Sequence, residues 1–281
     1  MKTSKWIIVV ATLCLLFVTL IIIFSINMFN YYNVKKDFYI AIEENDISTV
    51  RELLDRYPSF ANSTRNPILT FISGSGPTAL TLSIRKRAGM ELIQCLVENG
   101  ADVNKAPLSL STDPQYPLLE ALSFGRYDVA WYLIEQGADI HISTKLETTS
   151  FAILRGENDT KEKMEAQFEL FEYMMSNKVS LDAPPRLSEQ QKTYLCQAVI
   201  SGNVYIVEFL LTSAEFQADL NVVDKYGKTP LMYAVKKQYY DICQLLLEHG
   251  ADTAIEDQNG KTAYDYAAEL EDPILIQMLT K

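Results

Sequence analysis

The chain has 281 residues, of which 48% are apolar and 22% are charged, a composition that is ordinary for a folded protein. Its charge is unevenly distributed: residues 1–36 contain lysines but no acidic residue, whereas the remaining residues hold 21 basic and 36 acidic side chains and a net charge of −15. Because a domain this acidic repels phosphate groups, we expect neither nucleic acid nor an anionic lipid surface as its ligand.

The first predicted element is an apolar run from Trp6 to Phe29 that contains no charged residue. As a helix it would reach roughly 36 Å, enough to cross a bilayer core that is about 30 Å thick. A cleavable signal peptide has a shorter apolar region of about 7–15 residues that ends in small residues. We therefore predict a short N-terminal tail over 1–5, an uncleaved single-pass transmembrane anchor over 6–29, and a linker over 30–36.

Charge specifies the orientation of this anchor only weakly. Lys2 and Lys5 precede the apolar run, and Lys35 and Lys36 follow it, so the positive-inside rule gives little preference. A leader this short ordinarily stays in the cytoplasm. We therefore expect the protein to be inserted in the membrane with its larger part outside the cytoplasm.

Cysteines and histidines indicate no metal or cofactor site in the remainder of the chain. Cys95, Cys196 and Cys243 form no Cys-x-x-Cys pair and are interpreted as small buried hydrophobes, which favours the reducing side of the membrane. His141 and His249 lack metal-ligand spacing. The chain also lacks a phosphate-binding loop and a Gly-x-Ser-x-Gly motif, so we expect neither an enzyme nor a bound cofactor.

A 33-residue period is clearest near the C-terminus. Residues 224–256 read DKYGKTPLMYAVKKQYYDICQLLLEHGADTAIE, and the next copy, DQNGKTAYDYAAELED, starts 33 residues later. Gly227 can adopt a positive φ, Thr229 can form a hydrogen bond at a turn, and Pro230 suits the first helical position. Gly250 suits the end of the second helix. One such unit buries too little apolar surface to be stable alone, so neighbouring units are expected to stack.

Gly-Ala-Asp endings recur at 100–102, 137–139 and 250–252, and less regular copies of the motif extend upstream. This pattern resembles the ankyrin repeat. The resemblance implies an all-α fold, an ankyrin-repeat α-solenoid of about seven helix-pair repeats with β-hairpin tips. The transmembrane helix predicted from the apolar run precedes it. The expected repeat domain covers 37–281, with repeats near 37–60, 77–104, 116–141, 148–182, 192–223, 224–256 and 257–281.

The repeat near 148–182 is the poorest copy. It lacks the Thr-Pro-Leu sequence and carries the insertion Gly-Glu-Asn-Asp-Thr-Lys-Glu-Lys between its helices. Since each repeat of such a stack contacts only its neighbours, one poor interface weakens the cooperativity between the two halves. We expect the weakest joint of the array here.

Members of the ankyrin family bind other proteins on a concave face that is formed by the hairpin tips and the inner helices. By position, the resemblance assigns to this face Leu82, Glu120, Gln197, Tyr233 and Tyr266 on the inner helices, and Tyr226, Lys228 and Lys261 at the tips. Tyrosines among charged side chains are typical of the residues that anchor protein interfaces. We therefore expect a protein partner, itself associated with the membrane, whose identity the sequence does not specify.

Two functions agree with these features. The first is a membrane-tethered protein-binding module that holds a partner near the membrane. The second is an immunity-type inhibitor that neutralises a toxic enzyme at the membrane, where an acidic concave face would suit a basic toxin. Rescue from toxicity on co-expression with a neighbouring gene product would distinguish the inhibitor from the adaptor.

Overall fold

The computed structural model describes residues 2–65, 76–106, 114–144, 148–156, 158–180, 194–213 and 218–280, with side chains described from Leu15 onward. The first side chains of the predicted anchor and parts of the predicted repeats near 148–182 and 192–223 lie outside these residues. The helices are α1 (Lys2–Glu43), α2 (Ile47–Arg56), the 3₁₀ helix η1 (Pro58–Asn62), α3 (Ala79–Arg85), α4 (Met90–Glu98), α5 (Pro117–Ser123), α6 (Tyr127–Glu135), α7 (Thr149–Ile153), α8 (Lys161–Ser176), α10 (Tyr194–Ser201), α11 (Val204–Thr212), α12 (Pro230–Lys236), α13 (Tyr240–Glu248), α14 (Ala263–Glu269) and α15 (Pro273–Leu279).

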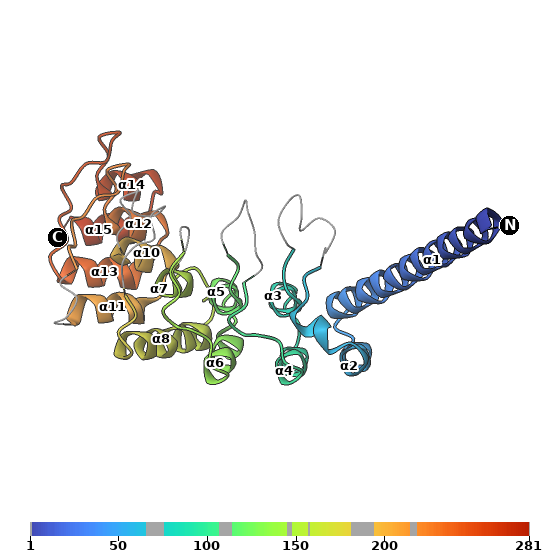
Figure 1. The fold of residues 1–281 in the computed structure, drawn as a ribbon. Helices are drawn as coiled ribbons and strands as arrows, with labels where there is room; N and C mark the ends of the chain where they lie inside the picture. Colours follow the sequence, from blue (N-terminus) through green and yellow to red (C-terminus); the bar gives the residue numbers. More distant parts are fainter. Residues whose placement is uncertain are drawn as a thin grey trace.

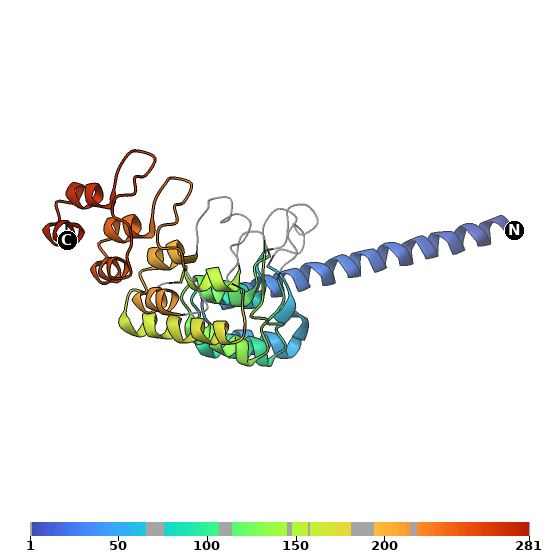
Figure 2. The ribbon, with the colours of Figure 1, turned by 90° about the vertical axis from the view of Figure 1, so that its left-hand side faces the viewer.

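These helices form a curved stack from which α1 projects at one end (Figures 1 and 2). Helices that follow one another in the chain pair up, from α1 with α2 to α14 with α15. The pairs then stack through two rows of contacts, one of which includes α3, α5 and α7 and then α10, α12 and α14. The described residues therefore form an α-solenoid.

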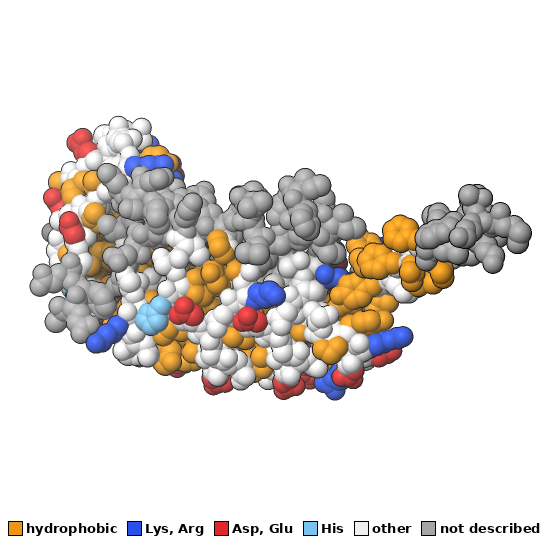
Figure 3. Space-filling model, in the orientation of Figure 1, with side chains coloured by type: hydrophobic (Ala, Val, Ile, Leu, Met, Phe, Trp, Pro, Cys, Tyr) orange, Lys and Arg blue, Asp and Glu red, His pale blue; other side chains and the backbone are white. Residues whose placement is uncertain are grey.

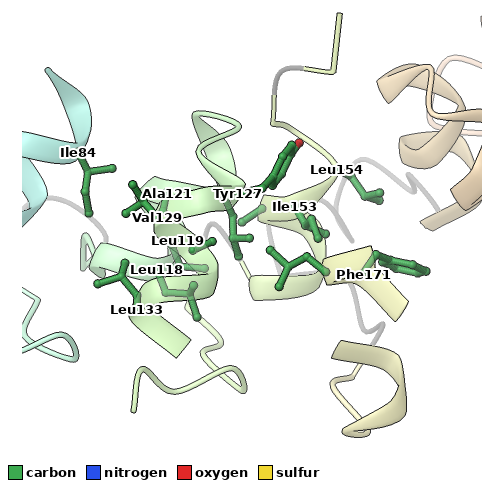
Figure 4. Packing of buried hydrophobic residues seen from close by; sticks show 14 of the residues in the cluster. Ile84, Leu118, Leu119, Ala121, Tyr127, Val129, Leu133, Ile153, Leu154 and Phe171 are labelled. Atoms are coloured by element: carbon green, nitrogen blue, oxygen red, sulfur yellow. The ribbon is translucent and has the colours of Figure 1, made fainter. Parts of the chain in front are cut away.

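One apolar core runs through the stack. Leu118 of α5, Leu133 of α6 and Ile153 of α7 are fully buried and belong to the same cluster (Figure 4). Each helix contributes apolar side chains from the face that it presents to its neighbours, the pattern expected when single repeats cannot form a core of their own.

Turn and cap residues of the repeats behave as the sequence predicts. The Thr229 side chain accepts a hydrogen bond from Met232 N, and Pro230 occupies the first helical position of α12. At the end of α13, Gly250 has φ +89°, and its N–H and that of Ala251 donate to carbonyls of the last helical turn. This is the geometry of a Schellman cap. Within the described ranges, the tips are turns with isolated bridges, as at Thr64–Thr78, and no β-strand extends them into the expected β-hairpins.

Asparagine side chains connect consecutive repeats along one edge. Asn104 donates from Nδ2 to the Gly137 carbonyl (2.9 Å) and accepts at Oδ1 from Asp139 N (2.8 Å). Asn221 accepts in the same way from Asp252 N (2.9 Å). The Gly-Ala-Asp ending therefore stabilises both its own helix and the contact with the preceding repeat.

The linker expected over 30–36 is helical, which corrects the prediction that a linker separates the anchor from the repeats. Helix α1 continues without a break from Lys2 to Glu43. Residues 30–36 include neither glycine nor proline, so nothing interrupts helix propagation. Val34, Phe38 and Ile42 follow one another at helical spacing, and Phe38 and Ile42 are fully buried. The last turns of α1 are therefore also the first helix of the repeat stack.

Aromatic contacts fix α1 against the first repeat. The Tyr31 ring lies edge-on to Phe60, with centroids 5.3 Å apart, and to Tyr57 at 6.2 Å. Tyr57 and Phe60 stack at 5.0 Å. Such pairs contribute about 0.5–1.5 kcal/mol each beyond the area that they bury. The direction of α1 is thus set by packing in the first repeat.

Candidate protein-binding surface

Two aspartates organise the tips of the last two repeats in the same way. Asp224 Oδ1 accepts from Tyr226 N (2.9 Å) and Lys228 N (3.0 Å), which closes the turn before α12. Its other oxygen accepts from the Tyr233 hydroxyl of α12 at 2.6 Å. Each tip is therefore fixed to its own inner helix by one carboxylate.

The second copy repeats this arrangement 33 residues later. Asp257 Oδ1 accepts from Asn259 N (2.8 Å) and Lys261 N (3.1 Å), and Oδ2 accepts from the Tyr266 hydroxyl at 2.5 Å. The predicted anchors Tyr233 and Tyr266 thus use their hydroxyls inside the protein. The Tyr266 side chain is only 9% exposed, which corrects the expectation that it contacts a partner, whereas Tyr233 is partly exposed and its hydroxyl already has an acceptor.

The two tips also contact one another directly. Gln258 N donates to the Tyr226 carbonyl at 3.0 Å, and Gln258 Nε2 donates to the Lys225 carbonyl at 2.6 Å. Gly227 has φ +76°, and a Cβ atom there would lie 2.9 Å from Gln258 N. Only glycine combines this backbone conformation with so close an approach. The tips therefore form one continuous surface.

Lysines cover the tyrosine rings of this surface. Lys228 Nζ lies 5.1 Å from the centroid of the Tyr266 ring, and Lys261 Nζ lies 5.7 Å from it. Lys225 Nζ is 5.0 Å from the ring of Tyr226, which is 49% exposed. Such cation–π contacts contribute about 0.5–1 kcal/mol each at exposed sites. A basic and aromatic patch thus stands out from an otherwise acidic domain.

Burial and hydrogen bonding raise the pKa values of both tyrosines. Burial, followed by the hydrogen bond to Asp257, raises the pKa of Tyr266 to about 12. Burial and the bond to Asp224 raise the pKa of Tyr233 in the same way. For Asp257, burial acts to raise the pKa, but the bonds from Tyr266 and from backbone N–H groups outweigh it, so the pKa lies below its ordinary value. At neutral pH the Tyr266–Asp257 pair is therefore a phenol donating to a carboxylate.

Replacing Tyr266 by phenylalanine is expected to lower the free energy of unfolding by about 1–3 kcal/mol, because a buried hydrogen bond to a carboxylate is lost. The pH dependence provides a second readout. The wild-type stability that Tyr266 contributes is fully present below its ordinary pKa of 10.0 and is lost as the pH rises to about 12, because the unfolded state ionises first. Tyr266→Phe should therefore show a shallower loss over this window. Tyr264→Phe is the matched control, since Tyr264 is 42% exposed, and an equal effect of both variants would contradict the assignment.

The structure corrects the expectation for Leu82. Its side chain is only 4% exposed, because α3 is enclosed by α1, α4, α5 and η1. Six consecutive residues of α3, from Ala79 to Ile84, are buried. Leu82 therefore lies in the core and offers no surface to a partner.

Glu120 and Gln197 are partly exposed on α5 and α10. Glu120 receives two hydrogen bonds from Arg85, at 2.8 Å from Nε and 2.6 Å from Nη2. Sequence reasoning missed Arg85, and it also missed the organising role of Asp224 and Asp257. The recurrence of an aspartate nine residues before a tyrosine in both copies is the signal that could have identified the latter two.

No three His, Cys, Asp or Glu side chains are arranged to hold a metal ion in the part of the chain that the structure describes. Among the described helices, α1 alone is long and apolar enough to cross a membrane, judged by length and composition.

Comparison with known proteins places this architecture in a family. The sequence model of ankyrin repeats in three copies matches residues 38–144, 163–257 and 215–281. The chain is 24% identical to Palmitoyltransferase AKR1 of Lachancea kluyveri over 83% of its own length and 29% of that protein. It is 29% identical to Ankyrin repeat and SAM domain-containing protein 6 of Rattus norvegicus, over 44% of the chain and 13% of the relative.

An ankyrin repeat protein of Rickettsia bellii is 34% identical over 23% of the chain and 40% of the relative. The chain thus spans well under half the length of each of these three relatives. The family model, by contrast, covers most of the chain, and its matches begin in the last turns of α1 and continue to residue 281. With its stacked helix pairs and Gly-Ala-Asp endings, the chain belongs to the ankyrin repeat family.

Proposed function

We propose that the protein is a membrane-tethered binding module, which inserts in a bilayer through residues 6–29 and holds a protein partner on its repeats. The observation that carries this proposal is the contrast between the two ends of α1. Leu15, Phe24 and Phe29 are each about two-thirds exposed, at 66%, 66% and 65%, whereas the last turns of α1 are buried in the repeat stack. Figure 3 shows the apolar side chains along the part of α1 that projects from the array.

A helix with this exposure favours lipid as its surroundings. No part of the most apolar stretch of α1 is buried against the rest of the chain, whereas the core helix of a soluble protein is mostly buried. Transferring such apolar side chains from water to hydrocarbon stabilises the inserted state by about 1.5–3 kcal/mol for each large residue. One helix of this kind among the described residues supports the proposal of a single pass.

The continuous helix changes what the anchor does. A flexible linker would let the repeats sample many orientations above the membrane, whereas α1 fixes one orientation through the packing of Tyr31 and Phe38. The surface that carries Tyr226, Lys228 and Lys261 is then held at a defined height. Restricting the search volume raises the effective concentration for a partner that is also in the membrane. The proposed role is binding without catalysis.

The orientation proposed for this anchor puts the repeats outside the cytoplasm. Labelling of Cys243 cannot test this, since its side chain is only 1% exposed, and burial followed by the charge of Asp272 raises the pKa of its thiol to about 12. Asn259→Cys would instead place a thiol on an exposed tip. A membrane-impermeant thiol reagent should label this variant in intact cells. Labelling only after lysis would place the repeats in the cytoplasm.

Site-specific photo-crosslinking tests the binding role. A photoreactive residue at Tyr226 should give a discrete adduct in the membrane fraction, and the charge reversals Lys228→Glu and Lys261→Glu should abolish it. The matched control is the same residue at Glu172, which is exposed on α8 and belongs to neither tip. Equal adducts at both positions, or an adduct that survives the charge reversals, would contradict binding at this surface.

A further inference from the structure

A pocket of about 210 Å³ lies where α1 meets the first repeat. Its lining residues on α1 share one helical face, and Arg65 completes it from the segment after η1. The lining residues are Tyr32, Lys35, Lys36, Tyr39, Ile40 and Arg65. Basic and aromatic side chains thus surround the same space directly after the apolar part of α1.

Lys35 is the unusual member of this set. Its side chain is only 6% exposed, and among the described residues none forms a hydrogen bond or an ion pair with its ammonium group. An ammonium carries three donors, and burying it without acceptors or a counter-charge is costly. An anion would stabilise a buried cation of this kind, and no residue that the structure describes supplies one.

The neighbouring groups add donors and fix the shape of the pocket. Glu43 accepts from Arg65 Nη1 at 2.6 Å and from Nη2 at 3.0 Å, which holds the guanidinium in place. The Tyr39 hydroxyl donates to the Ser63 carbonyl at 2.8 Å. Lys36 is exposed at the rim. Two lysine charges thus remain available for an anion, beside an arginine that is already oriented.

The pocket lies at the outer edge of the lipid headgroup layer if residues 6–29 span the bilayer. From Phe29 to Lys35 the helix rises about 9 Å, and the polar layer on each side of a bilayer is roughly 5–8 Å thick. A lysine side chain can also extend back toward this layer. Tyr32, one turn earlier, lies within it.

We propose that this pocket binds the phosphate group of an anionic phospholipid, with Lys35 as its central ligand and Lys36 at the rim. The proposal rests on the membrane anchoring proposed above. It differs from the expectation that the acidic charge of the repeats disfavours an anionic lipid surface. At physiological ionic strength, charges more than about 8 Å away are largely screened, so the nearby lysines outweigh distant carboxylates.

The test uses the full chain, purified in detergent and examined by native mass spectrometry with added phosphatidylglycerol or phosphatidylcholine. Wild-type protein should bind one phosphatidylglycerol at least about tenfold more tightly than phosphatidylcholine. Lys35→Gln should lower the affinity for phosphatidylglycerol about tenfold. Lys36→Gln, at an exposed position where the substitution does not affect folding, should lower the same affinity about threefold. Lys237→Gln removes the same charge from an exposed site far along the stack and should change nothing.

Equal retention of the two lipids, or unchanged retention in Lys35→Gln and Lys36→Gln, would overturn the proposal. Displacement of the lipid by an equal concentration of inorganic phosphate would assign the pocket to free phosphate and would also overturn it. Extraction of membranes with alkaline carbonate separates the two proposals. A chain released by carbonate contradicts the membrane anchor itself, whereas a chain that stays in the membrane but shows no lipid preference contradicts only this inference.

Discussion

Replacing Asn203 by leucine is expected to lower the free energy of unfolding by roughly 3–5 kcal/mol. Asn203 is fully buried, and its Nδ2 donates to Gln167 Oε1 at 2.7 Å and to the Met164 carbonyl at 2.8 Å. Its Oδ1 caps α11 by accepting from Tyr205 N at 3.0 Å. Loss of these bonds leaves buried partners unpaired, at a cost of about 1–3 kcal/mol for each.

The measurement is thermal unfolding of the full chain in detergent, followed by circular dichroism. A loss of this size corresponds to a fall in Tm of roughly 6–20 °C. Asn259→Leu is the control, because Asn259 is exposed at a tip, and its Tm should stay within about 2 °C of the wild type. A change for Asn203→Leu as small as that of the control would show that the network does not stabilise the joint.

This network lies at the joint that sequence analysis predicts to be the weakest. Gln167 of α8 is fully buried and donates to the Ile153 carbonyl at 2.6 Å, and Asn158 donates to the Ser201 carbonyl at 2.8 Å. Buried polar groups thus connect the irregular fourth unit to the fifth. Since the tips that carry Tyr226 and Lys261 lie beyond this joint, their position relative to α1 depends on it.

Gly156→Ala is the second substitution with a large expected effect, a loss of about 3 kcal/mol. A Cβ atom at Gly156 would lie 2.5 Å from the Leu122 carbonyl oxygen and would also clash with the Tyr127 hydroxyl. The backbone of α5 cannot move away without disturbing the adjacent core, and overpacking of this kind typically costs about 1–3 kcal/mol or more.

Gly89→Ala provides the matched comparison for this prediction. Gly89 precedes α4 with φ −61°, and the nearest atom to an added Cβ is Asn45 Nδ2 at 3.8 Å. Its free energy of unfolding should change by less than about 1 kcal/mol. If both variants unfolded at the same temperature, the close packing at Gly156 would not contribute to the free energy of unfolding, which would contradict the prediction.

Local features of the repeats could be predicted from the sequence because they depend on nearby residues. Thr229, Pro230 and Gly250 act through bonds to atoms a few positions away, so their residue types suffice. The shared role of Asp224 and Asp257 could also be predicted from the sequence, because each accepts a hydrogen bond from the tyrosine nine residues later in the same repeat.

Features that depend on distant partners were not predictable in the same way. Leu82 occupies a position that the family exposes to partners, but α1 and η1 enclose it here, and only the folded neighbourhood reveals that. Asn203 and Gln167 are separated by 36 residues, with no pattern to pair them. The continuity of α1 is not evident from the repeat pattern, which begins near Asp37, and only the absence of glycine and proline in 30–36 indicates it.

The proposed anchor is one rigid helix that carries the repeats out of the membrane. Hydrogen–deuterium exchange of the full chain in lipid nanodiscs tests it most directly, through the backbone amides of residues 30–36. If α1 is continuous, these amides exchange as slowly as those of Phe38 to Ile42, because all of them are bonded within one packed helix. Exchange of 30–36 at the rate of an unstructured peptide, with Phe38 to Ile42 still protected, would show a flexible linker and contradict the account.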